Sequence, residues 1–543
     1  MSRSASVPVV PPSRRTSARP SAPAASSRPR AAAVLALARA ESVRMLRHPA
    51  VLVAVAVIVL PWLYRAATGD EGNLFPVLQV ESRLLQLPML LLAAATTLAV
   101  NLACLRASRQ GVDPLYEVLV LPRWARVAAH LLSVLPVAVL AAVLSGARLL
   151  YLSTRSGAAG SVQVWELLAV PALVLLGGAV GVLVAQVTKA VAAAPLVVAG
   201  LGLVTLAALV NNTSRNRWLS PVAYENEFAA PLPTALVWRP AEWHLLWLLA
   251  LAVLLTLISL RLSGIRSRLL TGGGAIVVVL AVAAAGMQFR SMPRTLEQRL
   301  TTATERPAEG QRCRTVERVT YCAFPEFSGR ITQWSEVVQG QLRYVPADLA
   351  SGQYAVRQRI FPQGNGTGGS VPPPADSWAA DDRAAGTAGA VTVGTDWTEG
   401  GHGADIANNE VISFSGLFAH RLVTGGQLET QRLTPVCGAR AVVTLWLAVR
   451  ATAGTEGAYD SLTERSFGGG IQLPVIGSAA GLLFGAPEQT VATELLDKPA
   501  AEVGAAVRDS WTELTAADTG TERAAELLGV PAPRIDPAER GLC

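Results

Sequence analysis

The chain has 543 residues, of which 51% are hydrophobic and only 16% are charged, and its formal net charge is +7. This balance is typical of a membrane protein that carries a soluble part. It gives no reason to expect a nucleic-acid partner, because anionic lipid at the cytoplasmic face of a membrane is sufficient to account for the basic excess.

The N-terminal segment is expected to lie in the cytoplasm without a fold of its own. Residues 1–31 are rich in Ser, Pro, Ala and Arg, and they hold too little apolar surface to form a core, so we expect a disordered tail. No short apolar stretch with a small-residue cleavage site stands near Met1, so the segment does not have the form of a cleavable signal peptide.

An amphipathic helix is predicted immediately before the first apolar span. Residues 32–48 have a helical composition, with leucine, valine and methionine side chains on one side. Glu41, Arg44 and Arg47 fall on the opposite, polar side, so we expect a helix that lies in the membrane interface. An N-terminal extension of the first span is the alternative.

Seven apolar stretches follow, and they predict an α-helical polytopic membrane protein. The stretches are residues 49–64, 84–105, 127–147, 167–187, 190–210, 243–260 and 272–289. Most of them reach the length of roughly 18–22 residues that a helix needs to cross the hydrocarbon core. None holds Lys, Asp or Glu in its interior, and a helix without a polar face is buried or lies in lipid. We therefore expect six spans within residues 49–262 and a seventh within residues 263–289.

Arginine placement sets the expected orientation, because short cytoplasmic segments carry an excess of basic residues. The N-terminal tail and the loops after the second and sixth spans are more basic than the alternate loops, and the tail decides the balance. A cytoplasmic N-terminus and seven spans place residues 290–543 outside the cytoplasm. Abundant arginine with almost no lysine indicates a high-GC, actinobacterial-like genome, and hence a bacterial cell membrane.

The cysteines agree with this placement. Cys104 lies in a span, whereas Cys313, Cys322, Cys437 and Cys543 lie in the C-terminal part, where an oxidising compartment favours disulfides. Cys313 and Cys322 flank a segment suited to a short hairpin, so we expect a disulfide between them. Four cysteines allow three pairings, and unpaired thiols are the remaining alternative.

The C-terminal part, residues 290–543, is predicted to form one α+β domain. Apolar residues recur at helical spacing in residues 331–345. Residues 356–361 and 442–449 are expected to be strands, because both are short runs rich in valine and other apolar residues. Residues 362–404 are rich in Gly, Thr, Asp and Pro and are expected to be a long loop or a disordered insert, and residues 488–530 are expected to be helical.

Familiar motifs for catalysis and nucleotide binding are absent from the sequence. It contains no G-x-x-x-x-G-K-[ST] phosphate loop, no H-E-x-x-H zinc motif and no G-x-S-x-G nucleophile elbow. His402 and His420 are the two histidines of the C-terminal part, and two ligands are too few for a usual catalytic zinc site. We also find no carboxylate inside a span of the kind that proton-coupled pumps use. We therefore expect no enzymatic activity, no metal and no cofactor in this chain.

The loop after the second span, residues 106–126, carries the most informative pattern. It begins with arginines and continues through a glycine, a Leu-x-Glu group and a Leu-Pro pair to a second basic group. The residues concerned are Gly111, Leu115, Glu117, Leu119, Leu121, Pro122 and Arg123. Leu115 and Leu119 would share one face of a helix, Glu117 would project to another side, and a proline would then end the helix.

This pattern resembles the signature loop of the membrane subunits, or permeases, of type-2 ATP-binding-cassette exporters. In that family a short helix of the loop docks into a groove on a separate ATPase, so the resemblance implies the same role for residues 111–123. The segment that contains Glu41, Arg44 and Arg47 resembles the elbow helix of the family, and residues 239–261 resemble the start of its sixth span. Here Val-Asp-Pro stands where the family usually has Gly-Thr.

The resemblance implies a six-helix exporter bundle with an added seventh span and an outer domain. The chain would couple ATP hydrolysis in a separate ATPase to substrate movement, and a second permease copy would complete the pathway. Some permeases of this class carry outer domains similar to zinc aminopeptidases, but the zinc motif is missing here. The alternatives are a membrane-anchored binding or sensing protein, a membrane-bound hydrolase and, for the loop itself, an ordinary basic connector.

Overall fold

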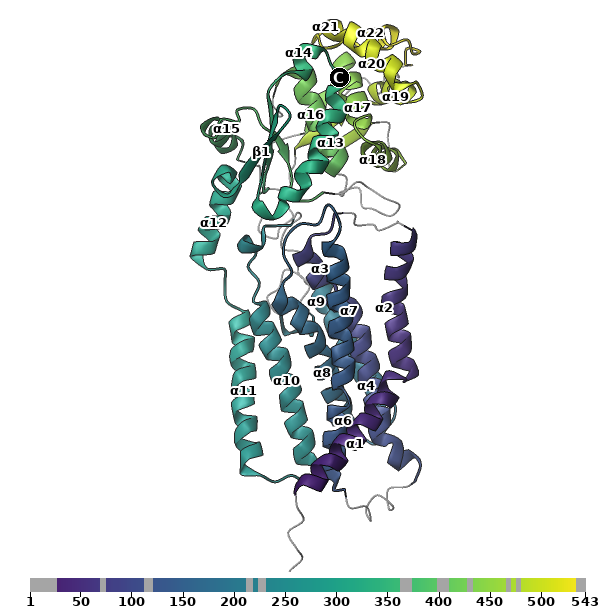
Figure 1. Ribbon diagram of the computed structural model, residues 1–543, viewed down its shortest axis with the longest axis vertical. Coiled ribbons are helices and arrows are strands. Elements are labelled where there is room, and N and C mark those ends of the chain that lie inside the picture. Colours follow the sequence, from purple (N-terminus) through teal and green to yellow (C-terminus); the bar gives the residue numbers. More distant parts are fainter. Residues whose placement is uncertain are drawn as a thin grey trace, which may run out of the picture.

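The structure is a computed structural model, and it describes most of the chain. The described residues are 27–68, 75–111, 121–210, 218–222, 231–361, 374–397, 410–426, 433–464, 470–474 and 480–533. A bundle of long helices forms one end of the molecule, and a C-terminal domain of helices and two small sheets stands on the other end (Figure 1).

Seven helical segments among the described residues are long and apolar enough to cross a membrane. They are α2 (Pro49–Thr68), α3 with α4 (Leu78–Leu84 and Gln86–Arg109), α6 with α7 (Arg123–Leu132 and Leu135–Ser153), α8 (Val164–Val187), α9 (Ala193–Val210), α10 (Ala241–Leu262) and α11 (Arg268–Gln288). Each contains or overlaps one of the seven predicted spans, which agrees with a multi-pass helical membrane protein.

Helices α4 and α8 form the centre of the bundle, and two glycines bring them close together. A Cβ atom at Gly177 would lie 2.7 Å from the Ala93 carbonyl oxygen, and one at Gly181 would collide with the Thr97 carbonyl oxygen. The Thr97 hydroxyl donates to the Gly177 carbonyl at 2.9 Å, and the Asn101 amide donates to the Gly181 carbonyl at 3.1 Å. Small residues and interhelical hydrogen bonds are the usual means of packing helices in lipid.

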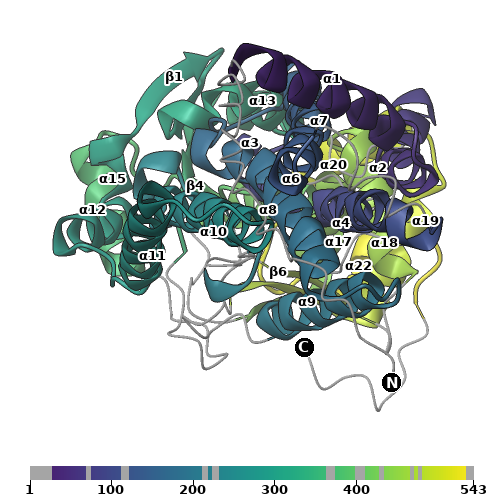
Figure 2. The ribbon, with the colours of Figure 1, turned by 90° about the horizontal axis from the view of Figure 1, so that it is seen from below.

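The other helices are arranged around this pair. Helices α7 and α10 pack on α8, α2 packs on α4, and α11 packs on α10. Seen from below, α2, α9 and α11 stand at the rim of the bundle, and α1 (Ser27–Leu46) crosses its edge (Figure 2). The rim helices expose large apolar side chains such as Leu60, Leu203 and Val279, as expected for surfaces that face lipid.

The C-terminal domain contains two sheets. The first has the order β1-β2-β3-β4, in which β1 and β2 are antiparallel and β2, β3 and β4 are parallel. The second has the order β5-β7-β6. The strands are β1 (Arg312–Val316), β2 (Val319–Ala323), β3 (Tyr354–Gln358), β4 (Val391–Val393), β5 (Leu433–Val436), β6 (Ile471–Pro474) and β7 (Gly481–Phe484).

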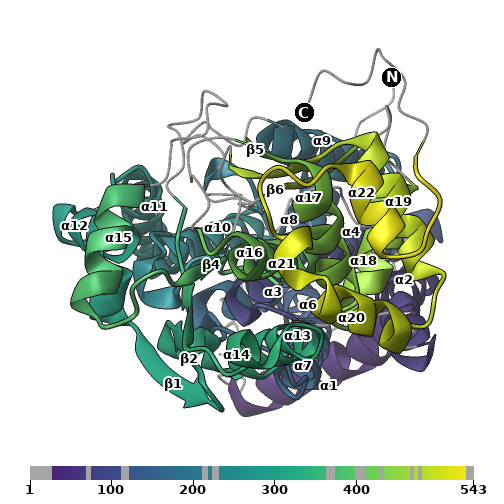
Figure 3. The same ribbon diagram turned by 90° about the horizontal axis from the view of Figure 1, so that it is seen from above.

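Helices fill the rest of this domain, as Figure 3 shows from above. They are α12 (Arg294–Glu305), α13 (Ile331–Leu342), α14 (Ala347–Ala350), α15 (Ala375–Ala384), α16 (Glu410–Thr424), α17 (Gly438–Val449), α18 (Ala453–Thr463), α19 (Ala486–Leu496), α20 (Ala500–Asp509), α21 (Trp511–Leu514) and α22 (Thr521–Leu527), with short 3-10 turns at Pro307–Gly310 and Pro325–Arg330. A further 3-10 turn, Thr234–Leu236, lies in the bundle before α10. The predicted helix at residues 331–345 and the helices at 488–530 are confirmed.

Two predictions for this domain were wrong. Residues 442–449 belong to helix α17 and not to a strand. The sequence was misleading because α17 is buried on all sides and therefore lacks the polar stripe that identifies a helix. Residues 362–404 are not one long loop, since α15 and β4 lie within them. The buried side chains of Trp378, Val391 and Val393 explain why this polar stretch is ordered there.

The predicted hairpin and its disulfide are confirmed. Cys313 of β1 and Cys322 of β2 face each other as a cross-strand pair and are bonded. Cys437 is also in a disulfide, whereas Cys104 in α4 is a free thiol. The predicted presence of disulfides in the C-terminal domain therefore holds, and Cys543 lies outside the described residues.

Arg330 joins the C-terminal domain to the bundle. Its buried guanidinium donates to the carbonyl of Phe75, which precedes α3, at 3.0 Å and to the carbonyl of Thr395 at 2.8 Å. Beside it, the Glu326 carboxylate accepts hydrogen bonds from the backbone and hydroxyl of Thr234, in the loop before α10. Burial lowers the pKa of Arg330 to about 10, so the side chain stays charged at neutral pH. The two parts are thus held together by charged hydrogen bonds.

The close contact of α4 and α8 generates a stability prediction. Replacement of Gly181 by valine forces a side chain against the α4 backbone and should lower the free energy of unfolding by about 1–3 kcal/mol. Gly202→Val is the matched control, because nothing lies within 4 Å of a Cβ at that position in α9. Thermal unfolding of the purified variants in detergent measures the difference. Equal unfolding temperatures for the two variants would show that α4 and α8 do not pack this closely.

Candidate functional site

The described residues include both ends of the loop that resembles an ATPase-docking segment. Leu115, Glu117 and Leu119 lie outside the described residues. Gly111 follows the last turn of α4 with φ +66°, a left-handed conformation that glycine adopts without strain. Pro122 has an extended conformation and immediately precedes α6. The loop is therefore bounded by a glycine that ends one helix and a proline that begins the next.

The second end of the loop is attached to two other helices. Arg123 donates a hydrogen bond of 3.1 Å to the side-chain oxygen of Gln186, near the end of α8. Leu121 packs against an apolar cluster that contains Val34 and Ala38 of α1 together with alanines of α6. Leu121 and Arg123 therefore connect this end of the loop to α1 and α8 as well as to α6.

The first end of the loop is attached to α1 through Glu41. The Glu41 residue is only 4% exposed and accepts two hydrogen bonds from Arg106 of α4, at 2.9 and 3.3 Å. It accepts a third from Arg44 at 2.6 Å. The prediction that Glu41 lies on the polar side of α1, opposite its apolar side, was wrong, because Glu41 is buried while Leu35 is 62% exposed. Arg47 is exposed in the turn that follows α1.

The arginines keep this buried carboxylate ionised. Burial alone would raise the pKa of Glu41, but the hydrogen bonds and positive charge of Arg106, with further contributions from His130 and Arg44, outweigh burial and hold the pKa below its usual value of 4.5. A lowered folded-state pKa means that the ion pair contributes its full stability above pH 4.5 and loses it as the pH falls through the folded-state pKa. The ion pair between Glu41 and Arg106, which attaches α1 to α4, is therefore fully formed at neutral pH.

These contacts define the α1 clamp, which consists of Glu41 with Arg106 at one end of the loop and Val34 and Ala38 with Leu121 at the other. A single helix therefore holds both ends of residues 112–120. The segments that flank the loop are joined to α1 by an ion pair at Arg106 of α4 and by packed apolar side chains at Leu121, just before α6. This arrangement is suited to transmitting a rigid-body movement into the bundle.

A second polar cluster lies at the end of the bundle nearest the C-terminal domain. Glu166, in the first turn of α8, is 3% exposed and pairs with Arg239 at 2.7 Å. The Gln86 amide of α4 also donates to the Glu166 carboxylate. The predicted fourth span begins at residue 167, one residue after Glu166. Helix α8 begins earlier, at Val164, so Glu166 belongs to the same helix as that span.

Histidine and tryptophan extend this second cluster. The His244 ring of α10 lies 3.0 Å from the Gln288 side-chain oxygen of α11 and 3.3 Å from the Pro221 carbonyl. Trp218 and Trp247 contact the same ring. The cluster therefore connects α4, α8, α10 and α11 at one level. No motif could have revealed it, because its members are far apart in the sequence and have no characteristic spacing.

No known protein family, curated protein or solved structure matches this chain. Among the described residues, no group of three or more His, Cys, Asp or Glu side chains is arranged to hold a metal ion. His420 is half-buried in α16, and His402 lies outside the described residues. The α1 clamp is therefore the candidate site on which the functional argument depends.

The clamp predicts that α1 loosens when Glu41 is removed. Glu41→Ala leaves Arg106 without its buried partner and should weaken the attachment of α1 by roughly 1–2 kcal/mol, which is roughly a 5- to 30-fold increase in amide hydrogen exchange. Mass spectrometry of peptides from α1, with the protein in lipid nanodiscs, measures this exchange. Arg47→Ala is the control, since its side chain is exposed. Unchanged exchange in Glu41→Ala would mean that the ion pair does not hold α1.

Proposed function

We propose that this chain is the permease subunit of an ATP-driven exporter of the ATP-binding-cassette type. The observation that carries the proposal is that α1 holds both ends of the loop that resembles the ATPase-docking segment. ATP binds in a separate ATPase, and this chain carries the movement that ATP hydrolysis produces. A second permease copy and membrane lipid complete the assembly.

A movement of the docking segment can enter the bundle only through the contacts that join the two. If the docking segment could move independently of the bundle, a force from the ATPase would move the segment without moving the helices. Here the loop follows α4, which ends at Arg109, and it is joined to α8 by the hydrogen bond from Arg123 and to α1 by the clamp. Because α4 and α8 form the centre of the bundle, a push on the loop reaches the packed helices that would line a pathway.

The proposed location is a bacterial cell membrane, with the α1 end of the bundle in the cytoplasm and the C-terminal domain outside. The arginine-rich tail and the arginines near the α1 end support this orientation. The disulfide between Cys313 and Cys322 and the bonded state of Cys437 support an oxidising compartment for the C-terminal domain. A membrane-anchored binding protein is the second candidate, and it is favoured by a cavity in that domain.

The orientation is tested with reporter fusions. An alkaline phosphatase, which is active only outside the cytoplasm, should be active when it is fused after Cys543, and a reporter that works only in the cytoplasm should be silent there. The same pair of reporters in the turn between α10 and α11, after Gly264, should give the opposite result. Activity of the cytoplasmic reporter after Cys543 would contradict the proposed orientation. It would also contradict the inference from the disulfides that the C-terminal domain lies in an oxidising compartment.

Coupling is tested by variants of the docking segment. Leu119→Asp should sharply reduce copurification with the partner ATPase, because a carboxylate at an apolar interface is costly to bury. Glu117→Lys should impair transport or assembly by reversing a local charge. Arg266→Glu is the control, because it changes an exposed charge at the same end of the bundle outside this loop. If both loop variants copurify and transport normally, the loop is an ordinary connector.

A further inference from the structure

The chain between α11 and α12 carries two arginines at the end of the seventh candidate span. Helix α11 has 21 residues, so it is about 30 Å long, which matches the hydrocarbon core of a bilayer. Residues 289–293 join it to α12, which rises above it (Figure 1). Arg290 lies in this connection beside half-buried Phe289 and Met292, and Arg294 is the first residue of α12. When α11 crosses a membrane, both arginines therefore lie at the level of the lipid headgroups.

Arg290 continues the side of α11 that is turned away from the bundle. Ala281 and Gln288 are buried on the side that packs against α10. Val279 and Val282 are each 67% exposed on the other side, as expected for a surface that faces lipid. The backbone amide of Arg290 bonds to the last turn of α11 at 3.4 Å, and Arg290 lies about three helical turns beyond Val279 on the same side. Arg290 therefore stands where the lipid-facing surface meets the headgroup region.

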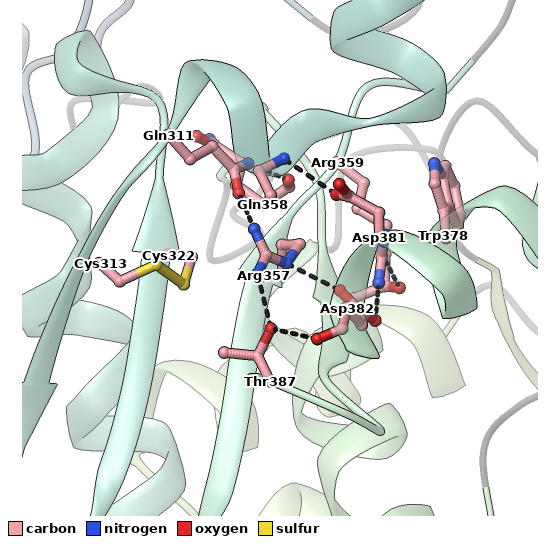
Figure 4. A network of polar contacts seen from close by, with 12 residues as sticks. Gln311, Cys313, Cys322, Arg357, Gln358, Arg359, Trp378, Asp381, Asp382 and Thr387 are labelled. Carbon is pink, nitrogen blue, oxygen red and sulfur yellow. Dashed lines mark hydrogen bonds and ion pairs between the residues drawn. A yellow bond between two sulfur atoms is a disulfide. The ribbon is translucent and has the colours of Figure 1, made fainter. Parts of the chain in front are cut away.

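Several other arginines of the C-terminal domain are matched with carboxylates. In the interior, Arg357 and Arg359 share the Asp382 carboxylate (Figure 4). On the surface, Arg306 pairs with Glu309 at 2.8 Å. The two arginines at the end of α11 are exposed, and neither forms an ion pair or a side-chain hydrogen bond with any residue that the structure describes. Their guanidinium groups can therefore bind a group outside the chain.

The charge at this end of α11 is positive. The two arginines are the only charged residues within residues 286–296. Glu297 follows in the first turn of α12, where exposed Arg299 offsets its charge. Glu242 stands at the start of α10, which packs on the side of α11 opposite to Arg290. Basic residues beside apolar ones are suited to the boundary between hydrocarbon and anionic headgroups.

The other side of α12 covers the junction between the bundle and the C-terminal domain. Leu296 and Leu300 of α12 pack against an apolar cluster that contains Val77 and Leu236 of the bundle and Phe327 of the C-terminal domain. Arg294 lies on the exposed side of the same helix. A group that binds Arg294 is therefore attached to the helix that seals this junction.

We propose that Arg290 and Arg294 bind the headgroup phosphate of an anionic phospholipid in the leaflet nearest the C-terminal domain. Guanidinium groups form strong, charge-assisted hydrogen bonds with phosphate oxygens. An anionic headgroup is favoured over a zwitterionic one, because the ammonium group of choline or ethanolamine would lie against the two arginines. The proposal rests on α11 crossing the membrane and does not depend on the exporter activity.

Photocrosslinking of the full chain in lipid nanodiscs tests the proposal. The discs consist of phosphatidylcholine with a trace of a probe lipid, either phosphatidylglycerol or phosphatidylcholine, that carries a diazirine near its headgroup. Mass spectrometry of a chymotryptic digest measures the crosslink yield within residues 286–300. The phosphatidylglycerol probe should crosslink there at least about fivefold more than the phosphatidylcholine probe, because each basic residue near the surface gives roughly this preference for anionic lipid. Equal yields for the two probes would overturn the proposal.

Variants assign the preference to the two arginines. Arg290→Gln combined with Arg294→Gln should lower the ratio of the two yields to about one, because both guanidinium groups are lost. Arg312→Gln combined with Arg314→Gln is the matched control, because these arginines are also exposed but belong to β1, which lies farther from the bundle than α12 (Figure 1). Circular dichroism confirms the fold of each variant. An unchanged ratio in the first variant, or an equal fall in the control, would show that this arginine pair does not bind the lipid.

Glycerol 1-phosphate separates a lipid from a soluble source of phosphate. An excess of it should leave the crosslink of the phosphatidylglycerol probe unchanged, because it lacks the acyl chains that hold a lipid beside the arginines. Loss of the crosslink would show that the arginines take soluble phosphate esters, and the lipid proposal would fail. None of these measurements requires an ATPase, so their outcome is separate from that of the exporter proposal.

Discussion

The rest of the structure depends on the contact between α4 and α8. Glycine at positions 177 and 181 lets the two backbones approach, and Thr97 and Asn101 then form hydrogen bonds across the gap. Helices α2, α7 and α10 pack directly on this pair. Arg106 at one end of α4 holds α1, and Glu166 at the opposite end of α8 holds the segment before α10 through Arg239. The two polar clusters are therefore joined by a rigid centre.

Most of the fold could be predicted because membrane helices leave strong local signals. Apolar length alone identifies the spans, and the spacing of Cys313 and Cys322 indicates a hairpin. Helix α17 was mistaken for a strand because a helix buried on every side has no periodic polar face. Helix α15 was missed because a single buried tryptophan, Trp378, orders an otherwise polar segment through contacts that are distant in sequence.

The candidate site could be predicted only in part. The loop pattern directed attention to the end of the bundle where α1 lies, but the residue that holds α1 there could not be read from the sequence. Glu41 and Arg106 are separated by a complete span, and helical periodicity assigned Glu41 to the wrong side. Glu166 and Arg239 are likewise brought together by packing alone. The sequence shows that charged residues lie next to the spans. Only the three-dimensional structure shows which of them form ion pairs.

In the proposed exporter, a movement received at the α1 end passes through the bundle toward a C-terminal domain that Arg330 holds in place. The central claim is that a separate ATPase drives this movement. The most direct test purifies the chain with a stand-alone ATPase from the same organism and measures ATP hydrolysis in lipid nanodiscs with and without the chain. The account predicts that the chain forms a stable complex with the ATPase and changes its hydrolysis rate. An ATPase that neither binds the chain nor changes its rate would contradict the account.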